Sequence, residues 1–229
     1  MIMYLASNSR PEIQFAVHQC ARFTHNPKQS HSNAVKRIVR YLIATKNDGL
    51  VFNRSKELKL DCYAGADFAG LWSHESDQDP VCVKSRTGYV MTLGGCPLVW
   101  ASKLQTEISL STLEAEYIAL STAMRELIPI RRLLKEICEK FKTEMETMIS
   151  LHSTVFEDNN GAISLAQSPK LTPRTKHIAV KYHWFREHLG EEKGISLSKI
   201  ESENQKADLF TKGLVEATFR KIRKMLCGW

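Results

Sequence analysis

The longest helical pattern in the chain runs from Ser111 to Cys138. At about 100° per residue, the apolar side chains of this stretch fall into one stripe along the helix. The stripe consists of Leu113, Tyr117, Leu120, Met124, Leu127, Leu134 and Cys138. Ser111 and Glu114 have the spacing of a capping box, in which each side chain accepts a hydrogen bond from a backbone N–H of the first turn. We therefore predict a long helix that packs on the core and that Pro129 kinks or splits.

The first 50 residues predict a pair of helices. Residues 9–24 carry apolar side chains at helical spacing behind a Ser-x-Pro start, and residues from Ser30 or Ser32 to about Thr45 do so again. The turn residues at 47–49 end the second helix. Its outer side is basic, which indicates either a surface that binds nucleic-acid backbone or simply a solvated face.

Beyond Gly49 the pattern becomes that of strands, first alone and then alternating with helices. The predicted strands are 50–52, 58–64, 88–93, 97–100, 151–157 and 195–200. The further predicted helices are 159–167, a basic helix at about 174–189, a short helix at about 204–213, and a terminal helix around residues 219–226. Short turns between the early strands indicate antiparallel pairing, and the later alternation favours parallel pairing. We therefore expect an α/β protein with a mixed sheet.

Composition and charge narrow the class of protein. A chain of 229 residues with 43% hydrophobic content can bury one main core and a small second unit. The net charge of +7 favours an anionic partner, of which nucleic acid is the commonest. No run of residues approaches the roughly 18 apolar residues of a membrane span, and the N-terminus lacks a signal-peptide pattern. We therefore expect an intracellular protein with no membrane partner, and six reduced cysteines that serve in packing.

Glu116 lies near the apolar side of the long predicted helix. Its direction is about 50° from the centre of the apolar stripe, whereas that of Glu114 is about 110° away. A carboxylate that faces the core costs several kcal/mol unless a partner compensates it. One such partner is a lysine or arginine in an ion pair. The other is a metal ion, which would require further acids at the same place.

Three further acids stand at informative positions. Asp67 follows the first full strand, Asp158 ends a later strand, and Asp208 lies in the late short helix. Residues just beyond strand ends and on the covering helices meet at one edge of a mixed sheet. Four carboxylates there suit two Mg²⁺ or Mn²⁺ ions, which clamp the attacking and leaving oxygens in phosphodiester hydrolysis. The simpler roles are a turn residue for Asp67, a helix N-cap for Asp158 and a surface charge for Asp208.

Four motifs, in this order, resemble the ribonuclease H domain of copia-type retrotransposon polyproteins. They are residues 111–117, residues 157–159, residues 174–178 with 181–183, and residues 206–212. The resemblance implies the ribonuclease H fold, a five-stranded mixed sheet flanked by helices. It also implies that residues 1–50 are the helical end of the preceding reverse transcriptase, its thumb and connection region, and that residues 51–229 are the ribonuclease H-like domain.

The same resemblance implies the site residues and the reaction. The family's metal-binding acids carry over onto Glu116, Asp158 and Asp208, but its usual first-strand aspartate is replaced here by Gly65. Asp67, two residues further and thus on the same side of an extended chain, is the nearest substitute. We expect hydrolysis of the RNA strand of RNA/DNA hybrids with two Mg²⁺ ions, or Mn²⁺, at a rate that Gly65 lowers.

The resemblance also implies the partners. The residues expected to contact phosphates without reading sequence are Arg174, Lys176, His177, Lys181 and Arg186. The protein would work with the reverse transcriptase and integrase of the same Pol polyprotein, in the cytoplasm and in the virus-like particle of an active element. One alternative is a weakened remnant that binds nucleic acid without efficient cleavage. The other, an integrase-type nuclease, would place its key glutamate on a late helix, which the early Glu116 argues against.

Overall fold

The computed structural model describes residues 1–229 except 53–57, 73–80, 142–148, 151, 169–174 and 176. Its centre is a mixed sheet with the strand order β3-β2-β1-β5-β6. The strands are β1 (Leu58–Asp67), β2 (Arg86–Leu93), β3 (Cys96–Leu104), β5 (Ser153–Glu157) and β6 (Ile195–Lys199). A two-residue strand, β4 (Ile149–Ser150), pairs with β1 outside this order. The β1–β2 and β2–β3 pairs are antiparallel, and the β1–β5 and β5–β6 pairs are parallel, which confirms the mixed sheet.

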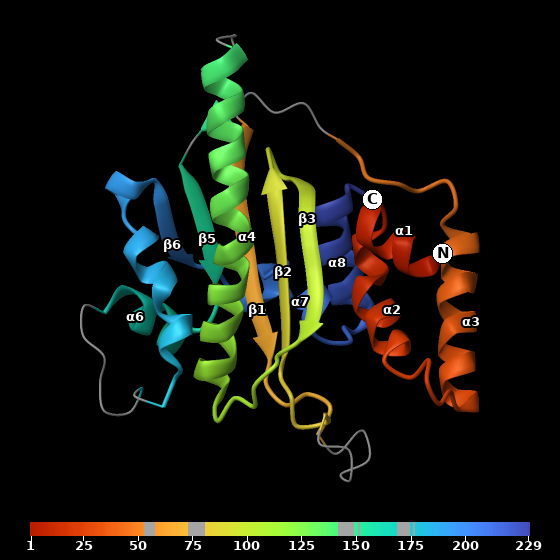
Figure 1. Cartoon of the computed structure of the whole chain (residues 1–229). Coiled ribbons are helices and arrows are strands. Elements are labelled where there is room, and N and C mark those ends of the chain that lie inside the picture. Colours follow the sequence, from red (N-terminus) through yellow and green to blue (C-terminus); the bar gives the residue numbers. More distant parts are fainter. Residues whose placement is uncertain (53–57, 73–80, 142–148, 151, 169–174, 176) are drawn as a thin grey trace.

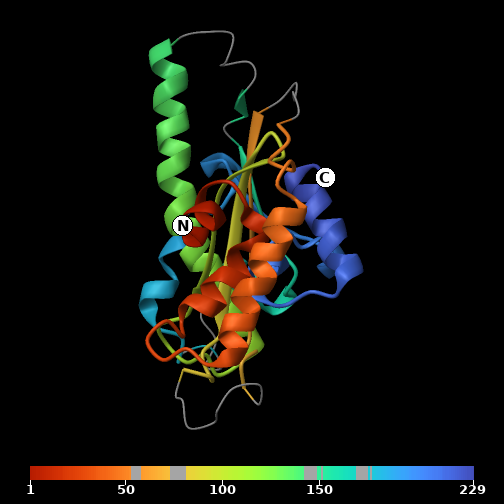
Figure 2. The same ribbon diagram turned by 90° about the vertical axis from the view of Figure 1, so that its right-hand side faces the viewer.

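Helices cover both faces of the sheet (Figure 1). On one face lie α4 (Thr112–Phe141) and α6 (Asn160–Gln167), and on the other lie α7 (Asp208–Thr211) and α8 (Glu216–Cys227). Figure 2 shows α4 and α8 on opposite sides of the sheet when it is seen edge-on. Each face of the sheet packs against its helices in a separate hydrophobic core, and the side chains of β1 point alternately into the two cores. Leu60, Cys62 and Ala64 pack under α4, whereas Tyr63 packs under α7 and α8.

The N-terminal helices lie beside the β3 edge of the sheet (Figure 1). They are α1 (Ile2–Asn8), the 3₁₀ turn η1 (Pro11–Ile13), α2 (Gln14–Ala21) and α3 (Gln29–Ala44). The helix α1 was not predicted, whereas α2 and α3 confirm the expected pair. Trp100 on β3 donates a hydrogen bond from Nε1 to the Ala6 carbonyl oxygen at 2.7 Å, which joins α1 to the sheet.

Three sequence-based expectations about these elements differ from the structure. The helix α4 is not split at Pro129, because Pro129 is exposed and its buried neighbours Leu127 and Ile128 hold both sides of the helix on the core. Residues 50–52 form no strand, since the Val51 N–H donates to the Cys227 carbonyl oxygen instead. The late short helix is only α7, preceded by the 3₁₀ turn η6 (Ser202–Asn204).

The basic helix expected at about 174–189 was also wrong. The described part of this segment contains two short 3₁₀ turns, η3 (Val180–Tyr182) and η4 (Trp184–His188). Its β-branched and aromatic residues have low helix propensity. Contacts with the core fix the segment instead, because Tyr182 and Phe185 are buried and Trp184 Nε1 donates to Ser121 Oγ at 3.1 Å.

Candidate active site

The second turn of α4 places Glu116 at the end of the sheet where β1 and β5 finish. Ser111 Oγ accepts a hydrogen bond from the Glu114 N–H at 3.2 Å, as a capping box requires. The Glu114 carboxylate accepts from the Leu110 N–H at 2.7 Å, one residue earlier than expected. Glu116 is only 7% exposed, as its helical position predicts. Glu114 is equally buried, contrary to expectation, because its carboxylate bonds back to the chain and His177 lies beside it.

The end of β5 contributes two more acids. Glu157 is the last residue of the strand and has no exposed surface, and Asp158 follows it. The N-cap of α6 is Asn159, whose Oδ1 accepts from the Ala162 N–H at 3.0 Å, so Asp158 does not serve as the cap. The Asp158 carboxylate instead accepts a hydrogen bond from Ser202 Oγ at 2.7 Å.

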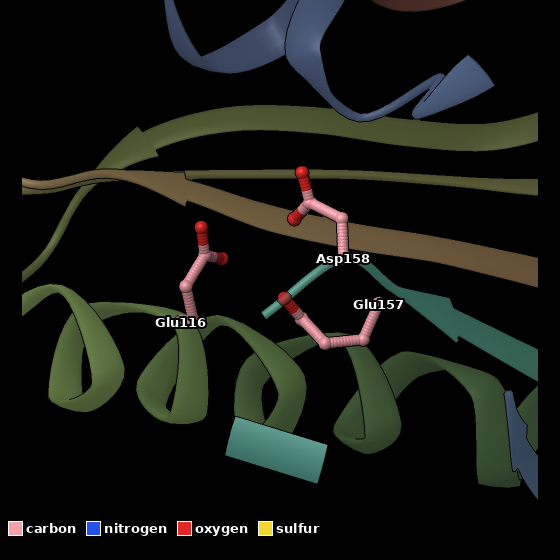
Figure 3. A group of neighbouring side chains, drawn as sticks. All are labelled: Glu116, Glu157 and Asp158. Atoms are coloured by element: carbon pink, nitrogen blue, oxygen red, sulfur yellow. The ribbon is translucent and has the colours of Figure 1, made fainter. Parts of the chain in front are cut away.

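These elements bring three carboxylates together (Figure 3). Glu116, Glu157 and Asp158 each offer one oxygen, and these oxygens lie within 4.8 Å of one another. Within the described part of the chain, Glu116 Oε2 and Glu157 Oε2 are buried without a hydrogen-bond partner. Glu116 also forms no ion pair with any described lysine or arginine. Oxygen donors gathered in this way suit a hard divalent cation such as Mg²⁺ or Mn²⁺.

Asp208 approaches the cluster from α7, on the other face of the sheet. Gly88 lets this helix lie directly on β2, since a Cβ at Gly88 would be 2.7 Å from Thr211 Cγ2 and 2.8 Å from Phe210 Cβ. Asp208 Oδ2 forms an ion pair with Lys212 Nζ at 2.9 Å. The negative charge of Asp208 contributes to raising the pKa of Glu116, so the two carboxylates interact electrostatically.

Burial and mutual repulsion disfavour the charged forms of these acids. Burial, followed by the Asp158 carboxylate, raises the pKa of Glu116 to about 8. Burial and then the Glu116 carboxylate raise the pKa of Glu157 well above its ordinary value. Burial also raises the pKa of Asp208, although Lys212 opposes the shift. Groups of carboxyls with strongly raised pKa values are typical of sites that bind a cation or carry out catalysis.

The structure does not place the Asp67 carboxylate in this cluster. A Cβ at Gly70 would collide with the Asp67 carboxylate, so this side chain is turned toward the Gly70 turn. It borders a cavity of about 240 Å³ together with Lys84, Arg86 and Lys212. A Cβ at Gly65, in contrast, would lie 3.8 Å from Glu116 Oε2 and 3.4 Å from Ala207 Cβ. Position 65 therefore adjoins the cluster, whereas the Asp67 carboxylate lies beside Gly70 and is not one of the three acids that converge.

Three of the five residues expected to contact phosphates are described, and they lie near the N-terminal part of α4. His177 is exposed, and its Nε2 atom lies 3.4 Å from Oε2 of Glu114. Lys181 is also exposed and forms an ion pair with Glu107. Arg186 is half-buried in η4, and the neighbouring His183 contacts the Tyr117 hydroxyl through Nδ1 at 2.8 Å. The other two residues, Arg174 and Lys176, lie outside the described residues.

Glu157 is the residue of this site that the sequence analysis missed. The available signal was its place at the end of a predicted strand, directly before Asp158. Strand alternation puts neighbouring side chains on opposite faces, which made a joint role for both acids unexpected. The approach of α4 to the β5 end brings both near Glu116.

Comparison with known proteins identifies the family. No protein-family model matches the chain. The Pol polyprotein of transposon TNT 1-94 from Nicotiana tabacum is 36% identical over 228 residues, which cover 98% of this chain and 16% of that protein. The Pol polyprotein of transposon RE1 from Arabidopsis thaliana is 33% identical over 221 residues, covering 96% of this chain and 14% of that protein.

Among solved structures, LC11 ribonuclease H1 in complex with an RNA/DNA hybrid is similar to this chain, with 17% sequence identity and a TM-score of 0.41. The structural alignment covers 66% of this chain and 93% of the ribonuclease H1 chain. This structural likeness is too distant to bear on function. The chain spans about one sixth of the length of the transposon relatives, and no described helix is long and apolar enough to cross a bilayer. The match along nearly the whole chain, together with the sheet order and the flanking helices, shows that the chain belongs to the copia-type retrotransposon Pol polyproteins and contains their ribonuclease H-like domain.

Proposed function

We propose that this domain hydrolyses the RNA strand of RNA/DNA hybrids and depends on Mg²⁺ or Mn²⁺. The observation that carries the proposal is the convergence of Glu116 and Asp158, from α4 and from the end of β5, with a buried and unpartnered oxygen on Glu116 among the described residues. An unpartnered buried carboxylate oxygen is costly, and a cation removes that cost. Glu116, Asp158 and Asp208 would hold the metal. Bound there, the ions would supply the charge that stabilises the attacking and leaving oxygens of the phosphodiester.

The remaining features fit a nucleic-acid substrate. The chain carries a net charge of +7, and the segment with His177, Lys181 and Arg186 borders the same end of α4 as Glu116. Contacts of this kind neutralise phosphates and position a duplex without reading its sequence. We propose that the domain acts beside the reverse transcriptase and integrase of the same polyprotein, with residues 1–50 as the end of the reverse transcriptase.

A second candidate function is a weakened ribonuclease H that binds hybrids without efficient cleavage. Gly65 favours this alternative, because position 65 adjoins Glu116 and contributes no carboxylate. The orientation of Asp67 toward Gly70 favours it as well. Misplacement of reacting groups by about 1 Å can cost on the order of 100-fold in rate.

One cleavage assay separates the two candidates. The full chain is incubated with Mg²⁺ and a labelled RNA strand that is either single-stranded or paired with DNA. We expect cleavage of the hybrid alone and its loss when the metal is chelated. Binding of the hybrid without cleavage would favour the weakened form, and equal cleavage of single-stranded RNA would contradict both candidates.

A further inference from the structure

Glu157 is the most deeply buried acid of the cluster, and one of its two carboxylate oxygens lacks a hydrogen-bond partner among the described residues. The side chain has no exposed surface. Its Oε1 accepts a hydrogen bond from the Asn159 N–H at 3.0 Å. Its Oε2 has no partner among the described residues. Leaving such an oxygen unpaired costs about 1 to 3 kcal/mol, and more if the group is charged.

The unpaired oxygen is not remote from the other acids. Glu157 extends from the end of β5 toward Glu116 on α4, as Figure 3 shows. One oxygen from each of Glu116, Glu157 and Asp158 falls within 4.8 Å of the others. Oxygens bound to one Mg²⁺ at about 2.1 Å are at most about 4.2 Å apart. A small rearrangement of side chains would therefore let all three carboxylates reach the same ion.

We propose that Glu157 is a ligand of the divalent cation, together with Glu116 and Asp158. This inference rests on the proposed metal-dependent function and adds a carboxylate that is not among the metal-binding acids implied by the family resemblance. Glu157 reaches the cluster from the α4 face of the sheet, where Val155 of the same strand packs in the core. Position 65 adjoins the α7 face, where a Cβ would contact Ala207. Glu157 thus supplies a carboxylate to a site that lacks one at position 65, and does so from the opposite face.

The test measures Mn²⁺ binding to the full chain by calorimetry, without nucleic acid. Glu157→Gln keeps the shape of the side chain and its acceptor for the Asn159 N–H, but it removes the charge. We expect the Mn²⁺ dissociation constant of Glu157→Gln to rise about tenfold or more, a loss typical of altered metal surroundings. The matched control is Glu114→Gln, another buried glutamate, which lies on α4 outside the cluster and should change affinity by less than about twofold.

Unfolding of the metal-free proteins provides the second readout. Glu157→Gln should unfold at about the same temperature as the natural chain, because the amide has the shape of the carboxyl group and keeps the acceptor for the Asn159 N–H. Added Mn²⁺ should raise that temperature less in the variant. If Glu157→Gln does not fold, Glu157→Asp, which retains the charge on a shorter side chain, should show the same loss of Mn²⁺ affinity.

The outcomes separate this inference from the proposed function. Unchanged Mn²⁺ affinity in the Glu157 variants would overturn it, even if the natural chain cleaves hybrids. Absence of Mn²⁺ binding by the natural chain would overturn it as well. Mn²⁺ binding that depends on Glu157 in a chain that cleaves no hybrid would support it and would contradict only the cleavage function.

Discussion

A Cβ atom at position 65 would lie 3.8 Å from Glu116 Oε2, at ordinary van der Waals distance, and 3.4 Å from Ala207 Cβ. A side chain at position 65 would therefore begin beside Glu116 without a steric clash at its Cβ atom. We predict that Gly65→Asp raises the rate of hybrid cleavage about 10- to 100-fold at saturating Mg²⁺, because an additional carboxylate improves placement of the metal ions. The measurement is the single-turnover cleavage rate of one hybrid.

Asp67→Asn is the comparison variant for this prediction. The Asp67 carboxylate lies beside Gly70, so its replacement should lower the rate far less than replacement of Glu116. If the natural chain is already fully active, Gly65→Asp adds nothing and Asp67→Asn abolishes cleavage, then Asp67 is the ligand and this account of position 65 is wrong.

Binding of hybrids should depend steeply on salt. Each phosphate contact that is lost reduces the slope of log affinity against log salt concentration by about 1. We predict that Lys181→Gln and Arg186→Gln each reduce this slope, whereas Lys135→Gln, on the distant half of α4 and paired with Glu139, does not. Filter binding between low and moderate salt measures the slopes, and an affinity that does not change with salt would exclude a phosphate-based interface.

His18 joins α2 to the sheet, because its Nδ1 lies 2.8 Å from Arg86 Nη1 on β2 and accepts its hydrogen bond when the histidine is neutral. Burial, followed by the charge of Arg86, lowers the pKa of His18 from 6.5 to about 4. The unfolded chain therefore binds a proton below about pH 6.5 that the folded chain binds only near pH 4. We predict that the contribution of His18 to stability is fully present above pH 6.5 and is lost as the pH falls toward 4.

The variant His18→Gln should reduce this dependence, since glutamine can accept the same bond and does not titrate. Chemical denaturation at several pH values between 4 and 7 provides the comparison. The same dependence on pH in both proteins would show that His18 makes no such contribution. A single unfolding transition would further indicate that residues 1–50 and the sheet unfold together.

Much of the fold could be predicted because periodicity and turn residues agree with the tertiary structure in β1, β2, β3 and α4. The prediction failed between residues 174 and 189, where helical spacing of apolar residues coincides with low helix propensity. Buried contacts of Tyr182 and Phe185 determine that backbone, and they involve elements far away in the sequence.

In the acidic cluster, too, the sequence predicted only what local geometry determines. The direction of Glu116 followed from its position in the helix, because helix geometry alone fixes it. The placement of Glu157 depends on how α4 crosses the end of β5, and the orientation of Asp67 depends on the close approach of Gly70. The first relationship joins elements that are far apart in the sequence, so local spacing does not reveal it.

We propose that Glu116 and Asp158 hold the divalent cation required for hybrid cleavage. The most direct test of this role is the initial cleavage rate of one labelled RNA/DNA hybrid as a function of Mg²⁺ concentration, for the natural chain and for Asp158→Asn. We predict no cleavage without Mg²⁺, a saturable rise for the natural chain, and a rate lower by at least about 100-fold for the variant at every concentration. Cleavage by Asp158→Asn at the natural rate and with the same Mg²⁺ dependence would contradict it.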